Sequence, residues 1–169
     1  MRVSLGMLER IVYVSRVSAD PGADLGAGPG SGIGSEALYG IVREAHARNP
    51  AAGLTGALLL VDGCFVQLLE GPAVPLAAAF GRIGNDPRHG RIEIRTREKA
   101  LCRLFPGQAL ALRTRACLDP DLLDGFGYRP GFPVADFPSD GLVEFLVAAC
   151  RREAGHRRLR HRLPDRAAR

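Results

Sequence analysis

One hairpin constrains the fold of this chain more than any other stretch of its sequence. Two apolar runs, at residues 55–61 and 64–69, are separated only by Asp62 and Gly63. An Asp-Gly pair between two such runs is typical of a two-residue β-turn, and both runs are shorter than ordinary helices. We therefore expect two adjacent antiparallel strands in the middle of the chain, with the other elements packed around them.

A single polar side chain interrupts the second of these runs. Gln67 lies among Phe65, Val66, Leu68 and Leu69. A buried amide without hydrogen-bond partners costs about 1–3 kcal/mol. We therefore expect Gln67 to be hydrogen-bonded, either to another part of the protein or to something that the protein binds.

Helices and further strands are expected on both sides of the hairpin. Apolar residues recur at helical spacing in residues 35–48 and in a second segment that ends near 86–87. Apolar and β-branched residues predict strands at 10–15 and 91–97, and residues 108–113 are consistent with a fifth strand. The order strand, helix, strand, strand, helix, strand, strand predicts an α+β fold. It is a ferredoxin-like βαββαββ mixed sheet with two helices on one face.

The C-terminal part of the chain has a different pattern. Residues 119–138 are rich in Gly and Pro with interleaved aromatic residues, and we expect them to wrap around the core. One apolar stripe of a final helix then contains Leu142, Phe145, Leu146 and Ala149. We expect this stripe to cover the open face of the sheet or to meet a partner. These patterns predict a domain at 1–118, a C-terminal helical extension at 119–153 and a basic tail at 154–169.

The net charge of +5 is concentrated at the C-terminus. Residues 151–169 contain eight arginines against two acidic residues and carry +6, which leaves −1 for the 150 residues before them. Such a tail suits contact with nucleic acid or acidic surfaces. A solvated, partly disordered end is the simpler interpretation, so we do not expect nucleic acid to be the main partner.

Cysteine spacing and the lengths of the apolar runs argue against several other classes of protein. The four cysteines, at 64, 102, 117 and 150, form no C-x-x-C pair and have no nearby histidine at metal-ligand spacing. The Gly-rich residues 19–35 form a loop that is too long and irregular for a dinucleotide-binding turn. No apolar run is long enough to cross a membrane, and no signal peptide is recognisable. We expect a cytoplasmic protein without a metal site.

Several polar side chains are expected to converge on Gln67. A strand-helix-hairpin connection commonly makes the first and third strands neighbours, which would place Tyr13 beside Gln67 on the helix-covered face. Asn49 ends the first helix, so a phenol and two amides would meet in an apolar pocket suited to a planar heterocycle with polar edges. Arg82 and Arg88 would be placed to meet phosphate or ribose oxygens.

Each of these residues also has a simpler structural interpretation. Tyr13 could be a core residue with a satisfied hydroxyl. Asn49 stands before a proline and could merely stop a helix, and Arg82 could lie on a solvated helix face.

Four stretches of the chain are informative when they are taken together and in order: I-V-Y-V-S, R-N-P-A-A-G-L-T-G-A-L-L, D-G-C-F-V-Q-L-L-E-G-P and F-x-R-I-x-x-D-P-R-H. Together they resemble the BLUF family of blue-light receptors, which use FAD. The resemblance covers roughly residues 8–112, and residues 126–150 look like the C-terminal helical extension of short, single-domain members. It implies an FAD held between the two helices above the sheet.

The resemblance also implies roles for individual residues. Tyr13 matches the family's photoactive tyrosine and Gln67 its switching glutamine. In the implied mechanism, blue light drives electron and proton transfer from the tyrosine to the flavin, and the amide's hydrogen bonds are rearranged when the transfer reverses. Contacts to the cofactor are implied for Asn49, Arg82, Arg48, Asp86, Phe65, Ser15, Arg88 and His89.

The chain departs from the family's pattern near its fifth strand. Gln108 and Leu110 stand where the family usually has a tryptophan and a methionine, and the chain contains no tryptophan. Both residues are candidates for a relay of the light signal, although a solvated residue at a sheet edge is the more common role for a glutamine such as Gln108.

These observations predict a flavin-based blue-light sensor that is not an enzyme. Its output would pass to an unidentified protein partner or through a change in homo-oligomeric state. Two alternatives remain open: a photochemically silent scaffold of the same fold that binds proteins, and a nucleic-acid binder that acts through its basic tail. A yellow purified protein favours the sensor, a colourless one the scaffold, and steeply salt-dependent DNA binding the third.

Overall fold

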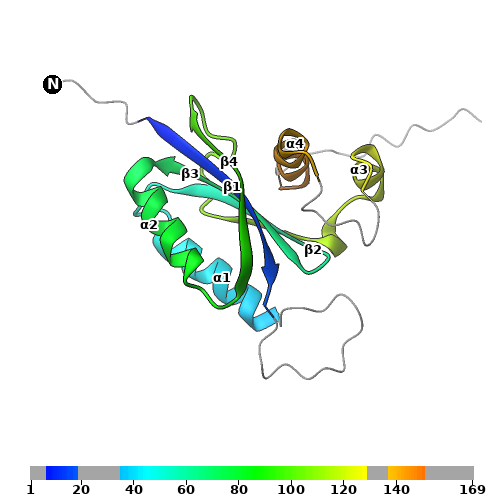
Figure 1. Ribbon diagram of the computed structural model, residues 1–169, viewed down its shortest axis with the longest axis horizontal. Coiled ribbons are helices and arrows are strands. Elements are labelled where there is room, and N and C mark those ends of the chain that lie inside the picture. Colours follow the sequence, from blue (N-terminus) through cyan, green and yellow to red (C-terminus); the bar gives the residue numbers. More distant parts are fainter. Residues whose placement is uncertain (1–6, 19–34, 129–136, 151–169) are drawn as a thin grey trace, which may run out of the picture.

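The computed structural model describes residues 7–18, 35–128 and 137–150. Its elements follow the predicted order and are drawn in Figure 1. They are β1 (Leu8–Val17), α1 (Ser35–Arg48), β2 (Thr55–Val61), β3 (Cys64–Pro72), α2 (Ala73–Gly84), β4 (His89–Ala100), β5 (Ala111–Thr114), α3 (Pro120–Gly125) and α4 (Ser139–Cys150). The predicted α+β, ferredoxin-like architecture with a C-terminal helix is confirmed.

The five strands form one mixed sheet in the order β4-β1-β3-β2-β5. The pairings β4–β1, β1–β3 and β3–β2 are antiparallel, and β5 runs parallel to β2. The first and third strands are therefore adjacent, as their connection predicts, and the register places Tyr13 directly opposite Gln67. Because side chains alternate along a strand, both residues face the same side of the sheet.

The central hairpin forms as its sequence predicts. Asp62 and Gly63 have φ angles of 45° and 71°, so both turn residues adopt the left-handed conformation of a type I′ turn. A Cβ added at Gly63 would meet nothing within 4 Å. Glycine is therefore favoured there by the backbone conformation and not by a lack of space.

The sheet is covered on both faces, as Figure 1 shows. Helices α1 and α2 pack on one face against Ile11, Tyr13, Leu58, Phe65 and Leu69. Helix α4 packs on the other face against Val12, Val14, Leu59, Val66 and Leu68. The predicted apolar stripe of α4 does cover this second face: Leu142, Phe145 and Leu146 are completely buried and Ala149 is half-buried.

The fourth and fifth strands differ from their predicted limits. β4 extends beyond residues 91–97 at both ends, because it pairs with β1 along that strand's whole length. β5 begins only at Ala111, so the prediction that a strand starts at Gln108 was wrong. Gly107 has a φ of 72° in the preceding turn, and the carbonyl of Gln108 accepts a hydrogen bond from the backbone N–H of Gly56 at 3.0 Å, before the β2–β5 pairing begins at Ala57.

A short helix, α3, lies in the Gly- and Pro-rich segment and was not predicted. The side chain of Asp119 accepts a hydrogen bond from the backbone N–H of Asp121 at 2.9 Å, and Pro120 occupies the first turn, where its missing N–H costs little. The segment does pack on the core, since Leu123, Tyr128 and Phe137 are buried.

The long Gly-rich loop and the basic tail lie outside the described residues, and so does Phe132. The division of the chain at residues 118 and 153 remains a prediction. In the described part of the chain, no helix has the length and apolar character needed to span a membrane, and no group of His, Cys, Asp or Glu side chains suits a metal ion.

Candidate functional site

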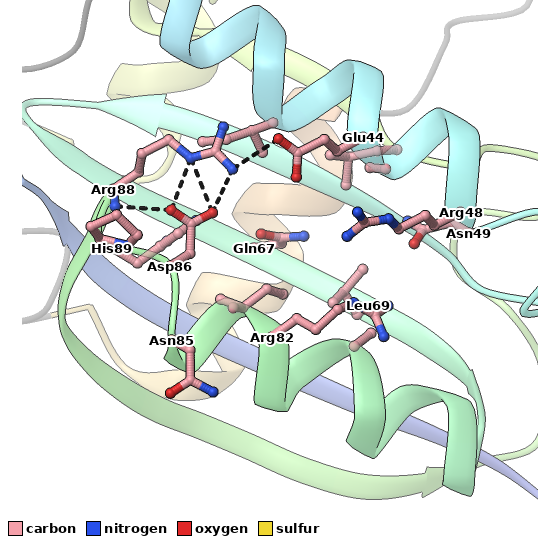
Figure 2. A pocket seen from close by; sticks show the side chains of 16 residues that line it. Glu44, Arg48, Asn49, Gln67, Leu69, Arg82, Asn85, Asp86, Arg88 and His89 are labelled. Atoms are coloured by element: carbon pink, nitrogen blue, oxygen red, sulfur yellow. Dashed lines mark hydrogen bonds and ion pairs between the residues drawn. The ribbon is translucent and has the colours of Figure 1, made fainter.

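A cavity of about 570 Å³ lies between α1, α2 and the sheet, within the range of roughly 300–1,000 Å³ that is usual for small-molecule sites. Gln67 and Leu69 of β3 line it, and Figure 2 shows the helices on either side. Of the twelve residues singled out from the sequence, eight line this cavity: Gln67, Asn49, Arg48, Arg82, Asp86, Arg88, His89 and Leu110. The other four, Tyr13, Ser15, Phe65 and Gln108, do not.

The hydroxyl of Tyr13 donates a hydrogen bond to Oε1 of Gln67 at the floor of the cavity. Tyr13 is completely buried, and Gln67 is 4% exposed. Among the described residues, none accepts a hydrogen bond from Nε2 of Gln67, and Figure 2 shows this nitrogen within the cavity, on the side of Arg48 and Asn49. The amide therefore joins the protein through its oxygen and leaves its donor to a ligand.

The surroundings of Tyr13 keep its phenol protonated. Burial raises the pKa of Tyr13 well above its ordinary value, and the negative charge of Asp86 raises it further. The rings of Phe80 and His89 stand edge-on to the phenol at centroid distances of 5.4 and 6.1 Å. The other two tyrosines lie elsewhere: Tyr39 is 62% exposed, and Tyr128 belongs to the core under α4.

Asn49 does more than end a helix. Its side chain is buried beside the cavity, and Nδ2 donates to the carbonyl oxygen of Ala109 at 2.8 Å. Its backbone carbonyl accepts a hydrogen bond from the N–H of Leu54, also at 2.8 Å. Its side-chain oxygen has no partner among the described residues, so Asn49 offers the cavity an acceptor.

His46 lies in α1, about one turn before Asn49, and bonds the residue that follows Ala109. Its Nε2 donates to the carbonyl oxygen of Leu110 at 3.0 Å, which keeps the buried Leu110 side chain against the cavity. Sequence reasoning missed His46, although its position three residues before Asn49 places both on one helix face. Gln108 is only partly buried and lies outside the cavity.

Arg88 is bound by two carboxylates at one end of the cavity (Figure 2). Its guanidinium donates to Asp86 over distances of 2.6 to 3.0 Å and to Oε1 of Glu44 at 3.2 Å. Although burial alone would raise it, the hydrogen bonds and charge of Arg88 hold the pKa of Asp86 below its ordinary value. The guanidinium also rests on Gly40 of α1, where an added Cβ would lie 3.2 Å from Nη1 of Arg88. Glu44 was not predicted, and its position one turn before Arg48 is the signal that could have found it.

Ser15 and Phe65 lie behind His89. Oγ of Ser15 and Nδ1 of His89 share a hydrogen bond at 2.8 Å, and the ring of Phe65 is tilted against the imidazole at 4.7 Å. Burial lowers the pKa of His89, so its ring is neutral near pH 7. In the structure Ser15 and Phe65 support His89, and their direct contact with a cofactor remains a prediction.

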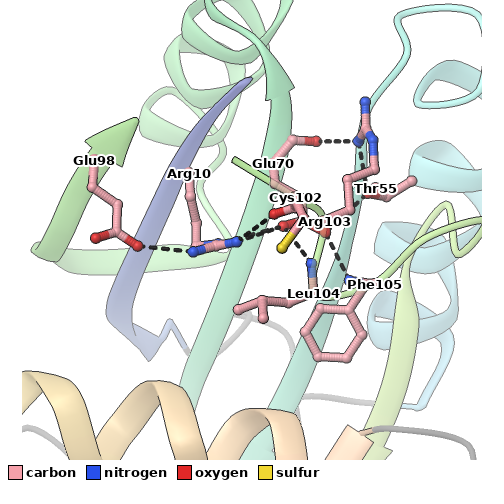
Figure 3. Close-up of polar contacts among 8 residues, drawn as sticks. All are labelled: Arg10, Thr55, Glu70, Glu98, Cys102, Arg103, Leu104 and Phe105. Carbon is pink, nitrogen blue, oxygen red and sulfur yellow. Dashed lines mark hydrogen bonds and ion pairs between the residues drawn. The ribbon is translucent and has the colours of Figure 1, made fainter. Parts of the chain in front are cut away.

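A buried carboxylate fixes the loop that leads to Leu110 (Figure 3). Glu70 of β3 is completely buried and accepts hydrogen bonds from the backbone N–H groups of Leu104 and Phe105 at 2.9 and 2.7 Å. It also accepts from Thr55 at 3.2 Å and forms a 3.3 Å ion pair with Arg10. Glu70, three residues after Gln67 in β3, thus fixes the backbone of the loop that leads to Leu110 and the cavity.

Comparison with known proteins places these residues in a family. The family model described as "BLUF: Sensors of blue-light using FAD" matches residues 8–111. Among solved structures, "BlrB - a BLUF protein, dark state structure" is 28% identical with a TM-score of 0.64, covering 85% of this chain and 95% of that one. The photo-activated state of BlsA has a TM-score of 0.71 over 87% of this chain and 97% of that chain, at 23% identity, and shows likeness of fold.

Curated relatives match a shorter stretch. The photoactivated adenylate cyclase subunit beta of Euglena gracilis is 48% identical over 52 residues, which is 31% of this chain. This chain spans 6% of that relative's length. The stretch that the family model matches, in contrast, is more than half of the chain. It includes Tyr13, Asn49, Gln67 and the Asp86–His89 stretch. The chain therefore belongs to the BLUF family of blue-light sensors.

Proposed function

We propose that this protein binds a flavin in the cavity and senses blue light through a rearrangement of the hydrogen bonds of Gln67. The observation that carries the proposal is the buried hydrogen bond from Tyr13 to Gln67 at the floor of a cavity between two helices. It connects a group that can release a proton to an amide that is free to bond a ligand.

The residues present fit a flavin ring. Nε2 of Gln67 is a donor, and the side-chain oxygen of Asn49 is an acceptor, and neither has a partner among the described residues. One edge of an isoalloxazine ring alternates carbonyl oxygens with N–H and ring nitrogen groups, which such donors and acceptors match. Apolar side chains from both helices, including Ile41 and Ala79, supply apolar surfaces against which the flat ring can pack.

We propose FAD as the flavin, since the family's description names it. A related structure, BlrP1 of Klebsiella pneumoniae, was determined with FMN. A bound flavin supplies absorption of blue light and an acceptor for an electron. The chain's own residues supply the rest of the mechanism.

Tyr13 and Gln67 act as one unit in this proposal. Tyr13 would give up one electron together with its phenol proton, the proton leaving along its hydrogen bond to Oε1 of Gln67, and both would later return to Tyr13. An amide has both a donor and an acceptor end, so Gln67 can rotate or change tautomer in between and present a different atom to the cavity. A change of about 1 kcal/mol in hydrogen bonding shifts a two-state equilibrium about fivefold.

We also propose that the chain has no enzymatic activity of its own. The curated relatives are by name photoactivated adenylate cyclases, and this chain spans 6% of the length of one of them. It spans 31% of the solved structure of "a bacterial light-regulated adenylyl cyclase". Because the match covers only a small share of each cyclase, we do not carry their enzymatic activity over to this chain. In this chain the signal would leave through the C-terminal helices to a separate protein or to a second copy.

The experiment is reconstitution of the full chain with FAD, followed by absorption spectra in the dark and after blue light. We expect one non-covalently bound flavin whose absorption moves reversibly to longer wavelength. Tyr13→Phe removes the transferable proton and should keep the bound flavin but lose the shift. A wild-type protein that binds no flavin would refute the proposal, and an unchanged shift in Tyr13→Phe would refute the mechanism.

A further inference from the structure

We propose that a groove between α2 and β4 docks an acidic, amphipathic helix of a partner protein, and that docking there is coupled to the Tyr13–Gln67 pair. The groove is separate from the cavity described above, and His89 is the one described residue that lines both. The docking itself does not depend on a bound flavin. Its coupling to light rests on the proposed function.

The α2–β4 groove has a volume of about 360 Å³ and is lined by Phe80, Gly84, His89, Arg91, Ile92 and Ile94. Ile94 lies opposite Tyr13 in the register, so it faces the helix-covered side of the sheet. It is nevertheless 47% exposed. Helix α2 therefore leaves this part of the sheet uncovered, and the groove presents apolar side chains to solvent.

The solvent-facing side of α2 continues this apolar surface. Val74, Ala77 and Gly81 are exposed and share one helix face with Gly84 of the groove. The single charged residue of α2, Arg82, lines the flavin cavity instead. A surface helix ordinarily carries polar or charged residues on this side. A Cβ added at Gly81 or Gly84 would meet nothing within 4 Å, so a second helix can approach α2 closely.

A bulge in β4 adds one positive charge to the groove. The register with β1 shifts between Val14 and Arg16, and Arg91 has a φ of 46° there. Consecutive residues of a regular strand face opposite sides, but the bulge lets Arg91 and Ile92 both line the groove. The guanidinium of Arg91 has no hydrogen-bond or ion-pair partner among the described residues.

These charges decide which partner fits. The residues that line the groove include one arginine and no carboxylate. Two copies of this chain that met face to face here would bring their Arg91 side chains together, which is unfavourable. A helix with carboxylates beside its apolar face would instead give Arg91 an opposite charge, while its apolar side chains fill the groove.

The groove also lies next to Tyr13. Phe80 and His89 line it, and their rings stand edge-on to the Tyr13 phenol at centroid distances of 5.4 and 6.1 Å. A side chain docked in the groove therefore packs against two residues that surround the phenol. Because coupling between sites is reciprocal, a rearrangement at Gln67 that moves these rings changes the affinity of the groove, and a docked helix favours one of the two states.

The six isoleucines of the chain allow the groove to be observed by NMR. With isoleucine methyl groups labelled in the full-length protein, Ile92 and Ile94 report on the groove and Ile41 reports on the flavin cavity. The probe is a synthetic helical peptide of about 15 residues, built of alanine and glutamate with phenylalanine and leucine four positions apart. We expect it to shift the Ile92 and Ile94 signals saturably, and the same peptide with lysine for glutamate to bind at least about tenfold more weakly.

Three variants assign the effect. Arg91→Glu should reverse the preference, so that the lysine peptide binds more tightly than the glutamate peptide. Gly81→Gln should weaken both peptides at least about tenfold, because it puts a side chain in the path of the helix, while open space and better helix propensity preserve the fold. Arg43→Glu makes the same change in net charge on the exposed side of α1, outside the groove, and should leave binding unchanged.

Illumination of the FAD-loaded protein tests the coupling, and we expect the affinity for the glutamate peptide to differ about fivefold between dark and light. Equal affinity in a protein whose flavin spectrum does shift would refute the coupling and leave the docking site standing. A protein that binds no flavin would refute the proposed function, and titration of the apoprotein would still decide the docking.

The docking site itself has its own contradicting results. Ile92 and Ile94 signals that do not respond to the glutamate peptide, or respond equally to both peptides, would refute it. A response of Ile41 alone would place the peptide in the flavin cavity. Ile92 and Ile94 signals that move with protein concentration in the absence of peptide would show that a second copy of the chain is the occupant.

Discussion

His89 connects the cavity to the residues that support its floor. It lines the cavity, shares a hydrogen bond with Ser15, and packs against the rings of Tyr13 and Phe65. Its burial makes the charged imidazolium unfavourable, and the neighbouring Arg88 adds to this effect, whereas Asp86 opposes it. Folding therefore favours the neutral form of the His89 imidazole.

This gives a pH dependence whose sign can be stated. The pKa of His89 is lower in the folded protein than in the unfolded chain, where it is about 6.5. Its contribution to stability is thus complete above pH 6.5 and is lost as the pH falls toward the folded pKa. We expect the free energy of unfolding to decrease below pH 6.5 by at most about 1.4 kcal/mol per pH unit. Urea unfolding of wild type and His89→Gln checks this, and an equal slope in both would show that His89 is not responsible.

At the level of single residues, the sequence predicted contacts that follow from register. Tyr13 meets Gln67 because a strand-helix-hairpin unit makes their strands neighbours. The partners of Arg88 could not be predicted in this way. Its contact with Glu44 joins a loop after α2 to the middle of α1, and such a distance depends on how the two helices are spaced.

Among the elements, the segment between β4 and β5 is fixed by contacts from elsewhere in the chain. Glu70, Asn49 and His46 bond three different parts of its backbone. A fifth strand starting at 108 was predicted from composition. The backbone carbonyls of residues 108–110 instead accept hydrogen bonds from Gly56, Asn49 and His46. Local sequence cannot reveal such long-range partners.

Glu70 should therefore contribute strongly to stability. Replacing it by Gln removes a buried charge that Arg10 and two backbone N–H groups share, and breaking a buried ion pair by changing one partner costs about 3–5 kcal/mol. Glu98→Gln is the control, because Glu98 pairs with the same Arg10 but its side chain is 52% exposed, and it should cost less than about 1 kcal/mol. Chemical denaturation measures both, and similar losses for the two variants would contradict the role given to Glu70.

In the whole molecule, the same segment runs between the two faces of the sheet. Phe105 is buried in the core under α4, and Leu110 is buried in the core beside the cavity. A second connection joins the hairpin to the C-terminal part, since the hydroxyl of Tyr128 donates to Asp62, and the Tyr128 ring stacks on Phe145 of α4. The final helix was predicted from its stripe, but these two connections were not, because they depend on tertiary packing.

Light should consequently change the protection of α4 and its approach. If residues 105–110 follow a rearrangement at Gln67, then hydrogen exchange in Ala111–Thr114 and Ser139–Cys150 should differ between dark and light, with helix α2 less affected. Exchange measured by mass spectrometry under illumination checks this. Identical exchange across the C-terminal segments, in a protein whose flavin spectrum does shift, would place the output elsewhere.

The central claim is that light changes the hydrogen bonds of Gln67, and the chain's composition allows it to be measured directly. Gln67 and Gln108 are its two glutamines, so in Gln108→Ala a carbon-13 label on the glutamine side-chain carbonyl reports on Gln67 alone. The measurement is the light-minus-dark infrared spectrum of flavin-loaded Gln108→Ala, with and without the label. We predict a carbonyl difference band that moves when the label is introduced and recovers in the dark together with the flavin absorption. A normal flavin shift with no label-sensitive band would contradict the account.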